Sequence, residues 1–227
     1  MTIHRRTPSR LLVIAGVGLF TGLDSSCTIH PDASGGGIRF RRDDLPGRPL
    51  IPAVASNIFG LAIHPAFAHL PPRNTALAVP GTQRAGAATV EHILSALAGL
   101  GITDALIGLD GDELPINDGS ALWPVQGLEL SGIAQLPATI APITLSQPLA
   151  VSDASGARIE AAPADRPLYT YNLDYGPASP IHAQSASWSG DPADYAANIA
   201  PARTFCLEAE ARAMQALGLF KDLSPRD

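Results

Sequence analysis

Two adjacent residues, Glu91 and His92, carry side chains suited to acid–base or metal chemistry, and they lie at the start of the apolar stretch TVEHILSALAGLGITD. Neighbours on a helix point about 100° apart, so these two side chains do not pair along the helix face. They can instead converge on one point beside the helix start. There His92 would bind Zn²⁺ and Glu91 would take a proton from the metal-bound water. The structural alternative is a Glu that favours the helix dipole beside a packed His.

The residues around this pair predict a helix that buries one face. Thr89 is the expected N-cap, and Gly99 and Gly101 are expected to end the helix, Gly101 as a left-handed C-cap. A buried strand over 105–110 follows, then the turn ELPINDGS and a second helix over 121–131. The apolar residues at helical spacing are Ile93, Leu94, Leu97 and Leu100.

Short β-type runs, separated by Gly, Pro, Asp and Ser, predict strands on both sides of this unit. The glycine and prolines of residues 132–142 suggest a boundary. A helical turn over 194–199 and a helix over 204–217 are expected near the end, and residues 50–80 are interpreted as irregular strand and loop. The expected strands cover 10–15, 24–30, 37–41, 143–151, 157–162, 168–174 and 181–188, the last two as a hairpin.

The order of these elements predicts an α+β fold with two similar two-layer α/β sandwich domains in tandem, the second of them incomplete. We expect residues 1–9 to form an N-terminal tail. Residues 10–135 would form the first domain, which carries the TVEH helix. Residues 136–227 would form a truncated second domain.

Composition limits the function classes. Of 227 residues, 46% are hydrophobic and 16% are charged, which is a globular composition. The net charge is −6 and the sequence has no Lys/Arg block, so we expect no nucleic-acid partner, because phosphate binding needs clustered positive charge. Cys27 and Cys206 do not suggest a disulfide framework, and we expect two reduced thiols.

The apolar run over 11–20 follows basic residues and is similar to a signal peptide. Gly16 and Gly18 interrupt it, and no small-residue cleavage site follows cleanly. We therefore interpret it as a buried strand of a cytoplasmic, monomeric protein, with export as the alternative. The run is too short to span a membrane, so no stable membrane insertion is expected.

Several ordered segments resemble the zinc-dependent UDP-3-O-acyl-N-acetylglucosamine deacetylases, which act early in lipid A synthesis. In that family a TVEH-type helix leads into an ALAGLGI turn, a strand and a loop similar to ELPINDGS. The resemblance runs from Arg10 to the end of the chain, and it implies hydrolysis of the N-acetyl group of a UDP-linked acyl sugar with Zn²⁺ as cofactor. The other matching segments are GVGLFTG, IRFRRDDL, LYTYNLDY and ARTFCLEAEARAMQALGL.

The resemblance also implies roles for single residues. Glu91 matches the general base, and His92 matches one zinc ligand. Thr204 matches the residue that hydrogen-bonds the developing oxyanion, and Phe205 matches a substrate contact. Asp118 matches an acidic residue that orients a neighbouring group, although an Asx-type turn explains it equally well from the local sequence.

Two positions depart from the family pattern. Phe20 stands where the family usually has His, and Cys206 stands where it usually has Gly. We expect both to contact substrate at the lip of the site, and the bulk of Cys206 bears on the preferred acyl-chain length.

The family takes its other zinc ligands from a later HKxxD helix, and its general acid from a later His, and this sequence has neither. His64 and His69, separated by Pro65, are interpreted as loop or surface residues. We interpret the chain as a fragment of a deacetylase. The alternative is a non-catalytic paralogue that binds a nucleotide-linked acyl sugar.

Overall fold

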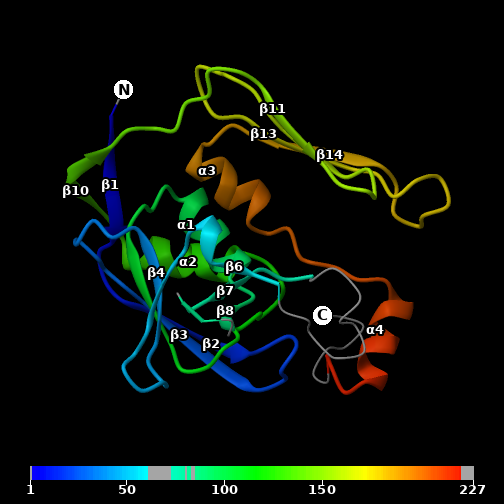
Figure 1. Ribbon diagram of the computed structural model, residues 1–227, viewed down its shortest axis with the longest axis horizontal. Coiled ribbons are helices and arrows are strands. Elements are labelled where there is room, and N and C mark those ends of the chain that lie inside the picture. The colour runs from blue at the N-terminus through cyan, green and yellow to red at the C-terminus, as the bar shows by residue number, and fades with distance from the viewer. Residues whose placement is uncertain (1, 61–72, 80, 83–84, 221–227) are drawn as a thin grey trace.

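A five-stranded sheet forms the centre of the computed structural model, which describes residues 2–60, 73–79, 81–82 and 85–220 (Figure 1). Residues 61–72, with His64 and His69, lie outside the described residues, as do 221–227. The sheet has the order β2-β3-β9-β4-β5, and only β4 and β9 run parallel. Its strands are β2 (Leu12–Val17), β3 (Asp24–His30), β4 (Ile38–Arg42), β5 (Leu50–Pro52) and β9 (Ala105–Leu109).

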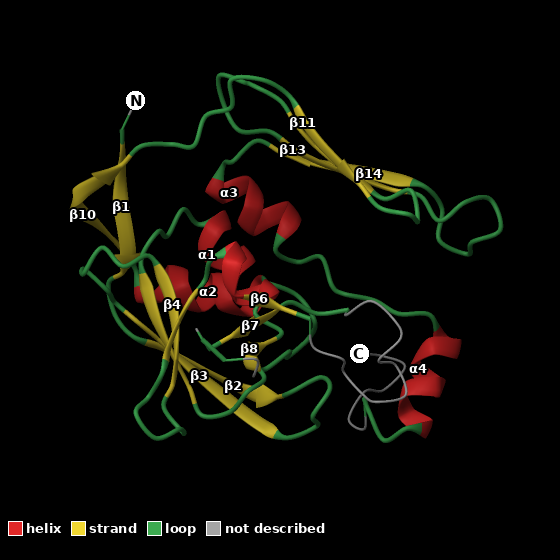
Figure 2. Ribbon diagram, viewed as in Figure 1, coloured by secondary structure: helices red, strands yellow, loops and turns green. Residues whose placement is uncertain are grey.

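Two helices, α1 (Glu91–Gly99) and α2 (Leu122–Ser131), cover one face of this sheet (Figure 2). Central strand β9 is apolar along almost its whole length, as expected for a strand with neighbours on both sides. Alternate residues of the other strands point toward the helices. The resulting core includes Cys27, Ile29, Phe40, Ile51, Ile107 and Leu109 from strands and Ile93, Ala96, Leu97, Val125 and Leu128 from helices.

A small three-stranded sheet leads into α1. It consists of β6 (Ile58–Phe59), β7 (Ala76–Ala78) and β8 (Ala85–Ala88), and a 3₁₀ turn over Ala55–Asn57 precedes it. Close packing explains its small residues, since a Cβ added at Gly86 would overlap Ile51. The last residue of β8 lies only three positions before Glu91, so this sheet fixes where α1 begins.

The first nine residues differ from the expected tail. Ile3–Pro8 form strand β1, which pairs antiparallel with β10 (Ile133–Ile140). Arg5 forms an ion pair of 2.5 Å with the fully buried carboxylate of Asp104. The N-terminus is therefore ordered by pairing with residues 133–140, a distant segment that the local sequence does not reveal.

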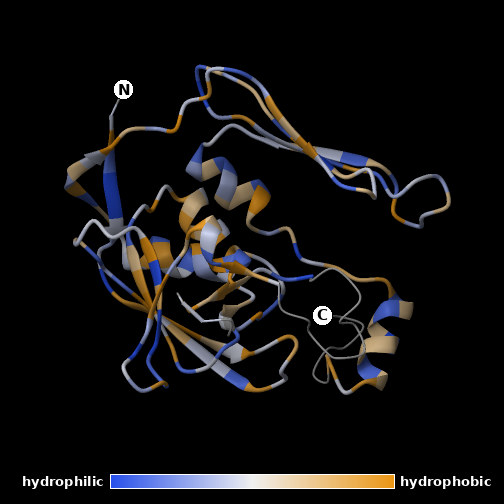
Figure 3. Cartoon of the chain, in the orientation of Figure 1, coloured by the Kyte–Doolittle hydropathy of each residue, from blue (hydrophilic) through white to orange (hydrophobic). Residues whose placement is uncertain are grey.

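The second half of the chain, residues 141–220 of the described part, contains two separate hairpins and three short helical segments. The described side chains of both hairpins are mostly exposed, and hydrophobic residues occur along them (Figure 3). The mixed α+β composition is confirmed, whereas the tandem sandwich arrangement and the domain limits stay predictions. The elements are β11 (Leu149–Ser152) with β12 (Arg158–Ala161), β13 (Tyr169–Leu173) with β14 (Gln184–Trp188), α3 (Pro192–Asp194), a π-helical turn (Tyr195–Ile199) and α4 (Glu208–Ala216).

The expected helix over 204–217 begins later than predicted. Residues 203–207 are not helical, and the Thr204 N–H donates to the carbonyl of Gly119 at 2.8 Å instead of entering a helix. Glu210 accepts the Leu207 N–H at 3.0 Å, which caps α4 and lowers the pKa of the Glu210 carboxyl. Tertiary hydrogen bonding thus overrides the local helix preference.

The second half docks onto the first through Tyr195. Its ring is buried against Gly99 of α1, and its hydroxyl forms a 2.5 Å hydrogen bond with Ser95. Burial raises the pKa of the Tyr195 hydroxyl. Ala200 then accepts the backbone N–H of Ala121 at 3.0 Å, at the start of α2.

We predict that Gly99→Ala destabilises the chain, because the added methyl would overlap the Tyr195 ring. Overpacking of this kind costs about 1–3 kcal/mol of unfolding free energy. Urea unfolding followed by tryptophan fluorescence measures the change. Gly111→Ala is the matched control, because no atom lies within 4 Å of a Cβ added there. Equal stability of the two variants would contradict the docking described above.

Candidate functional site

Glu91 and His92 form the first turn of α1, as the sequence predicted, but Thr89 is not the N-cap. The N-cap is Val90, with no side-chain hydrogen bond to the helix. Thr89 is buried with φ 57°, in the left-handed region, and its hydroxyl donates to Glu113 Oε1 at 3.3 Å. The partner that diverts this hydroxyl from the helix amides is distant in sequence, which is why the expected cap was wrong.

The Glu91 carboxylate is tied to another segment. Its Oε2 accepts the backbone N–H of Thr75 at 2.9 Å, just before β7. The side chain is half-buried and therefore keeps contact with solvent. This hydrogen bond engages one carboxylate oxygen and orients the group at the start of α1.

His92 is half-buried beside two carboxylates. Burial lowers the pKa of its imidazole, and the charges of Glu91 and Asp118 act in the opposite direction. A lowered pKa favours the neutral imidazole, which is the form that binds a metal.

Asp118 lies in a loop that packs against β2. Ile116 N–H donates to Val17 at 3.1 Å, and a Cβ added at Gly16 would overlap the Asn117 side chain. Asp118 Oδ1 accepts both the N–H and the hydroxyl of Ser120, at 3.0 and 2.7 Å. The Asx-type turn is therefore present, while the same carboxylate acts electrostatically on His92. The two interpretations of Asp118 are compatible.

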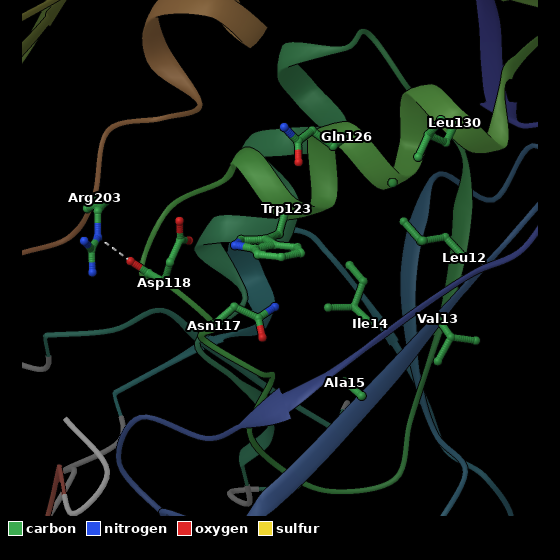
Figure 4. A pocket seen from close by; sticks show the side chains of 11 residues that line it. Leu12, Val13, Ile14, Ala15, Asn117, Asp118, Trp123, Gln126, Leu130 and Arg203 are labelled. Atoms are coloured by element: carbon green, nitrogen blue, oxygen red, sulfur yellow. Dashed lines mark hydrogen bonds between the residues drawn. The ribbon is translucent and has the colours of Figure 1, made fainter. Parts of the chain in front are cut away.

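The segment that carries Thr204 lies along this loop. Arg203 Nε donates to the Asp118 carbonyl at 2.6 Å (Figure 4), next to the Thr204–Gly119 hydrogen bond already described. A Cβ added at Gly119 would come within 3.1 Å of the Thr204 methyl, so Gly119 permits this close approach. Phe205 is 53% exposed and packs edge-to-face against Tyr175 at 6.5 Å between ring centroids.

Phe20 and Cys206, the two departures from the family pattern, lie in one apolar cluster. The Phe20 and Phe220 rings are 5.7 Å apart at 40°. Phe20 lies on the loop between β2 and β3, whereas Cys206 precedes α4, and their proximity is invisible in the sequence. The other cluster members, which sequence reasoning missed, are Leu19, Met214, Leu219 and Phe220.

Glu113 is a further site residue that the sequence analysis did not single out. It is only 5% exposed, and its carboxylate accepts the backbone N–H groups of Phe20 and Thr21 at 2.9 and 2.8 Å. A Cβ added at Gly18 would overlap Glu113 Oε2, which explains why the middle glycine of GVGLFTG is needed. The apolar residues that directly follow Glu113 in ELPI are a weak sequence signal for its burial.

A cavity of about 660 Å³ opens between β2 and α2 beside the Asp118 loop (Figure 4). Polar groups of Asn117, Asp118, Gln126 and Arg203 line it. Its other walls are largely apolar: Leu12, Val13, Ile14, Ala15, Trp123, Gly127 and Leu130. Glu91 and His92 do not line this cavity, so it is separate from the head of α1.

The described residues do not fit a complete zinc site. A catalytic zinc needs three protein ligands and an open position. Within the described ranges, no group of three or more His, Cys, Asp or Glu side chains is placed to hold a metal ion. His92 is therefore a candidate ligand without two further ligands in that part of the chain. In the same part, no helix is long and apolar enough to cross a membrane.

The comparisons with known proteins agree with one another. The family model described as UDP-3-O-acyl N-acetylglycosamine deacetylase matches residues 5–227. The chain is 34% identical to the UDP-3-O-acyl-N-acetylglucosamine deacetylase of Synechocystis sp., over 92% of this chain and 71% of that protein. It is 34% identical to the protein of that name from Nostoc sp., over 96% and 75%, and 30% identical to that from Leptospira biflexa, over 96% and 67%.

The two thiols are predicted to differ in reactivity. Cys27 is buried beside Asp110, and burial raises the pKa of its thiol to about 12, so it stays protonated and inaccessible. Cys206 is half-buried in the apolar cluster. Ellman's reagent at mildly alkaline pH should therefore modify one thiol in the folded chain and both in guanidinium.

The matched control is Cys206→Ser, which should show no reactive thiol until it unfolds. Two rapidly reacting thiols in the folded chain would contradict the packing around Cys27.

Proposed function

Because the chain belongs to the UDP-3-O-acyl N-acetylglycosamine deacetylase family, we propose that it hydrolyses the N-acetyl group of UDP-3-O-acyl-N-acetylglucosamine and releases acetate in lipid A biosynthesis. The observation that carries the proposal is a family match over residues 5–227 in a chain that holds Glu91, His92 and the Asp118 loop together. The Thr204 segment is hydrogen-bonded to that loop.

A water oxygen bonds to the acetamide carbon as the carbonyl double bond opens, and the carbon–nitrogen bond then breaks as the carbonyl re-forms. The attacking water loses a proton, and the leaving nitrogen gains one. Glu91 is the proposed acceptor of the water proton. Its Oε2 is held by the Thr75 N–H, and its Oε1 would accept the proton.

Negative charge builds on the carbonyl oxygen as the water attacks. The Thr204 hydroxyl is the proposed hydrogen-bond donor to that oxyanion. Its backbone is fixed to Gly119, so the donor is placed before the reaction starts. Asp118 is proposed to orient the neighbouring His92, on which its charge already acts.

We propose Zn²⁺ as the cofactor, with His92 as one ligand, following the resemblance to the zinc-dependent family. The metal would polarise the acetamide and lower the pKa of a bound water. The described residues do not complete a zinc site, and the roles of Glu91, Thr204 and Asp118 given above do not depend on one.

Phe205 is the proposed substrate contact next to Thr204, because its ring is exposed and backed by Tyr175. Phe20 and Cys206 are the proposed lip contacts, joined by the apolar cluster around Phe220. We further propose that the chain acts as a monomer in the cytoplasm, where UDP-linked sugars occur.

We predict that Glu91→Gln lowers kcat for acetate release by about 10²–10⁴-fold with little change in KM, because it removes the general base. The Gln amide oxygen still accepts the Thr75 N–H, so the fold should be kept. Acetate release from UDP-3-O-acyl-N-acetylglucosamine is the measurement.

Glu129→Gln, an exposed carboxylate change on α2, is the control and should behave as wild type. Full turnover by the Glu91 variant would rule out the proposed base. These measurements are made on the full-length deacetylase that contains these residues together with the later zinc ligands. No acetate release by that wild-type protein with added Zn²⁺ would overturn the proposed function.

We also predict that Thr204→Val lowers kcat by about 10²–10³-fold, since one oxyanion donor is lost while the shape is kept. Thr204→Ser is the matched variant, and it should retain most activity because it keeps the hydroxyl. The backbone bond to Gly119 is unaffected in both variants. Equal activity of the Val and Ser variants would exclude the hydroxyl from the reaction.

A further inference from the structure

Glu113 lies where two segments that flank the site meet. Its backbone runs parallel to the end of β8, with a bridge between Ala88 and Glu113. The Ala88 N–H donates to Asp112 at 2.7 Å, and the Leu114 N–H donates to Ala88 at 3.1 Å. The Ser25 hydroxyl donates to the Glu113 carbonyl at 2.5 Å. The position of Glu113 is therefore fixed by its main chain, independently of its carboxylate.

The Glu113 carboxylate accepts hydrogen bonds from two different segments. Two donors are backbone N–H groups of the glycine loop, Phe20 to Oε1 and Thr21 to Oε2. The third is the Thr89 hydroxyl, directed to Oε1. One buried side chain thus joins the loop that carries Phe20 to the turn that leads into α1.

Thr89 needs this support because of its backbone conformation. A φ of 57° is unfavourable for a β-branched residue and persists only where surrounding contacts hold it. Its hydroxyl donates to Glu113 and also accepts from Asn74 Nδ2 at 3.4 Å. Since Thr89 lies two residues before Glu91, its conformation sets the direction in which Glu91 and His92 leave the sheet.

We propose that Glu113 is a positioning residue for the deacetylation, holding both the start of α1 and the glycine loop in their working geometry. The inference rests on the proposed function. Glu113 acts through Thr89 on the general base, and through the Phe20 and Thr21 amides on the lip of the substrate site. Among the described residues, every hydrogen-bond partner of the Glu113 carboxylate is a donor, and both effects come from the carboxylate's role as their acceptor.

The charged form suits this role better than an amide. Hydrogen bonds to an ionised acceptor are stronger than those between neutral groups. In Glu113→Gln one oxygen is replaced by an NH₂ group, which would face an N–H donor of the loop or the Thr89 hydroxyl. At least one of the three donors would lose its acceptor in a buried place, and the loop or Thr89 would have to move.

The test measures the kinetics of acetate release for three full-length variants. Glu113→Gln should lower kcat by about tenfold or more and also raise KM, because both the base and the lip are displaced. Thr89→Val keeps the shape but removes the hydroxyl, so it should lower kcat and leave KM near the wild-type value. In the double variant, Thr89→Val should add little to the kcat loss of Glu113→Gln.

Asp110→Asn is the matched control. Asp110 also accepts a backbone N–H and a hydroxyl, both from Ser26 at 2.9 and 2.6 Å, but it does not reach the start of α1. It should keep wild-type kcat and KM. If Glu113 had only a structural role, its replacement would reduce the fraction of active protein. Apparent kcat would then fall while KM stayed unchanged, and the kcat losses of Glu113→Gln and Thr89→Val would be additive.

Amide hydrogen exchange supplies a readout that needs no activity. Glu113→Gln should accelerate exchange at Phe20 and Thr21 while β3 and β9 stay protected, and Asp110→Asn should not. Wild-type exchange at these two amides in Glu113→Gln overturns the anchoring. If Glu113→Gln does not fold, a Thr89→Val enzyme with wild-type kcat overturns the link to α1. An inactive wild type would count against the proposed function alone.

Discussion

The packing of Tyr195 against Gly99 is the contact on which the candidate site depends. Glu91 and His92 lie at one end of α1, and the Tyr195 ring packs near the other end of the same helix. From this contact the chain continues to Ala200, which is hydrogen-bonded to the start of α2, and then to Thr204 beside Gly119. Thr204 therefore reaches the loop that carries Asp118 because the Tyr195 ring packs against Gly99, where a larger residue would leave no room for it. Burial of an aromatic ring supplies much of the free energy of such a contact.

Polar groups at the start of α1 are arranged by partners from other segments rather than by the helix itself. The N-cap Val90 makes no side-chain hydrogen bond, so no N-cap side chain accepts the unpaired first amides of the helix. The nearby carboxylates of Glu91 and Glu113 instead accept amides of Thr75 and of the glycine loop. This arrangement makes the helix start a junction of four segments, which suits a site whose groups must be held from several directions.

The sequence predicted best the features that depend on local chemistry. Strands β2, β3, β4 and β9 and helix α1 lie close to where short apolar runs and helical spacing predicted them. Gly101 follows the end of α1 as predicted, with φ 67° and hydrogen bonds from Gly101 to Ala98 and Ile102 to Leu97. Prediction failed where distant partners decide. Strand β1 exists because β10 pairs with it, and residues before α4 are not helical because Thr204 is bonded to Gly119.

The same division holds for the candidate site. Glu91, His92, Asp118 and Thr204 could be proposed as site residues because each belongs to a segment that resembles a family motif. Glu113 was missed because its carboxylate accepts backbone amides of a loop that lies 92 and 93 residues earlier, and nothing in the sequence around Glu113 indicates these hydrogen bonds. The clustering of Phe20 with Cys206 is of the same kind, since only the fold brings the two together.

The two halves contribute unequally to the rigidity of the site. Glu91 and His92 stand on a helix packed into the main core, whereas Thr204 and Phe205 lie on an exposed, non-helical segment. Hydrogen bonds from Arg203 and Thr204 attach that segment to the Asp118 loop. Local opening of such a segment costs less free energy than opening of the core. The proposed base is therefore held by the fold as a whole. The proposed oxyanion donor is placed by the two hydrogen bonds to the Asp118 loop, whereas the exposed aromatic substrate contact, Phe205, can adjust. This suits a site that must bind an acyl sugar of considerable size and still fix the reacting amide.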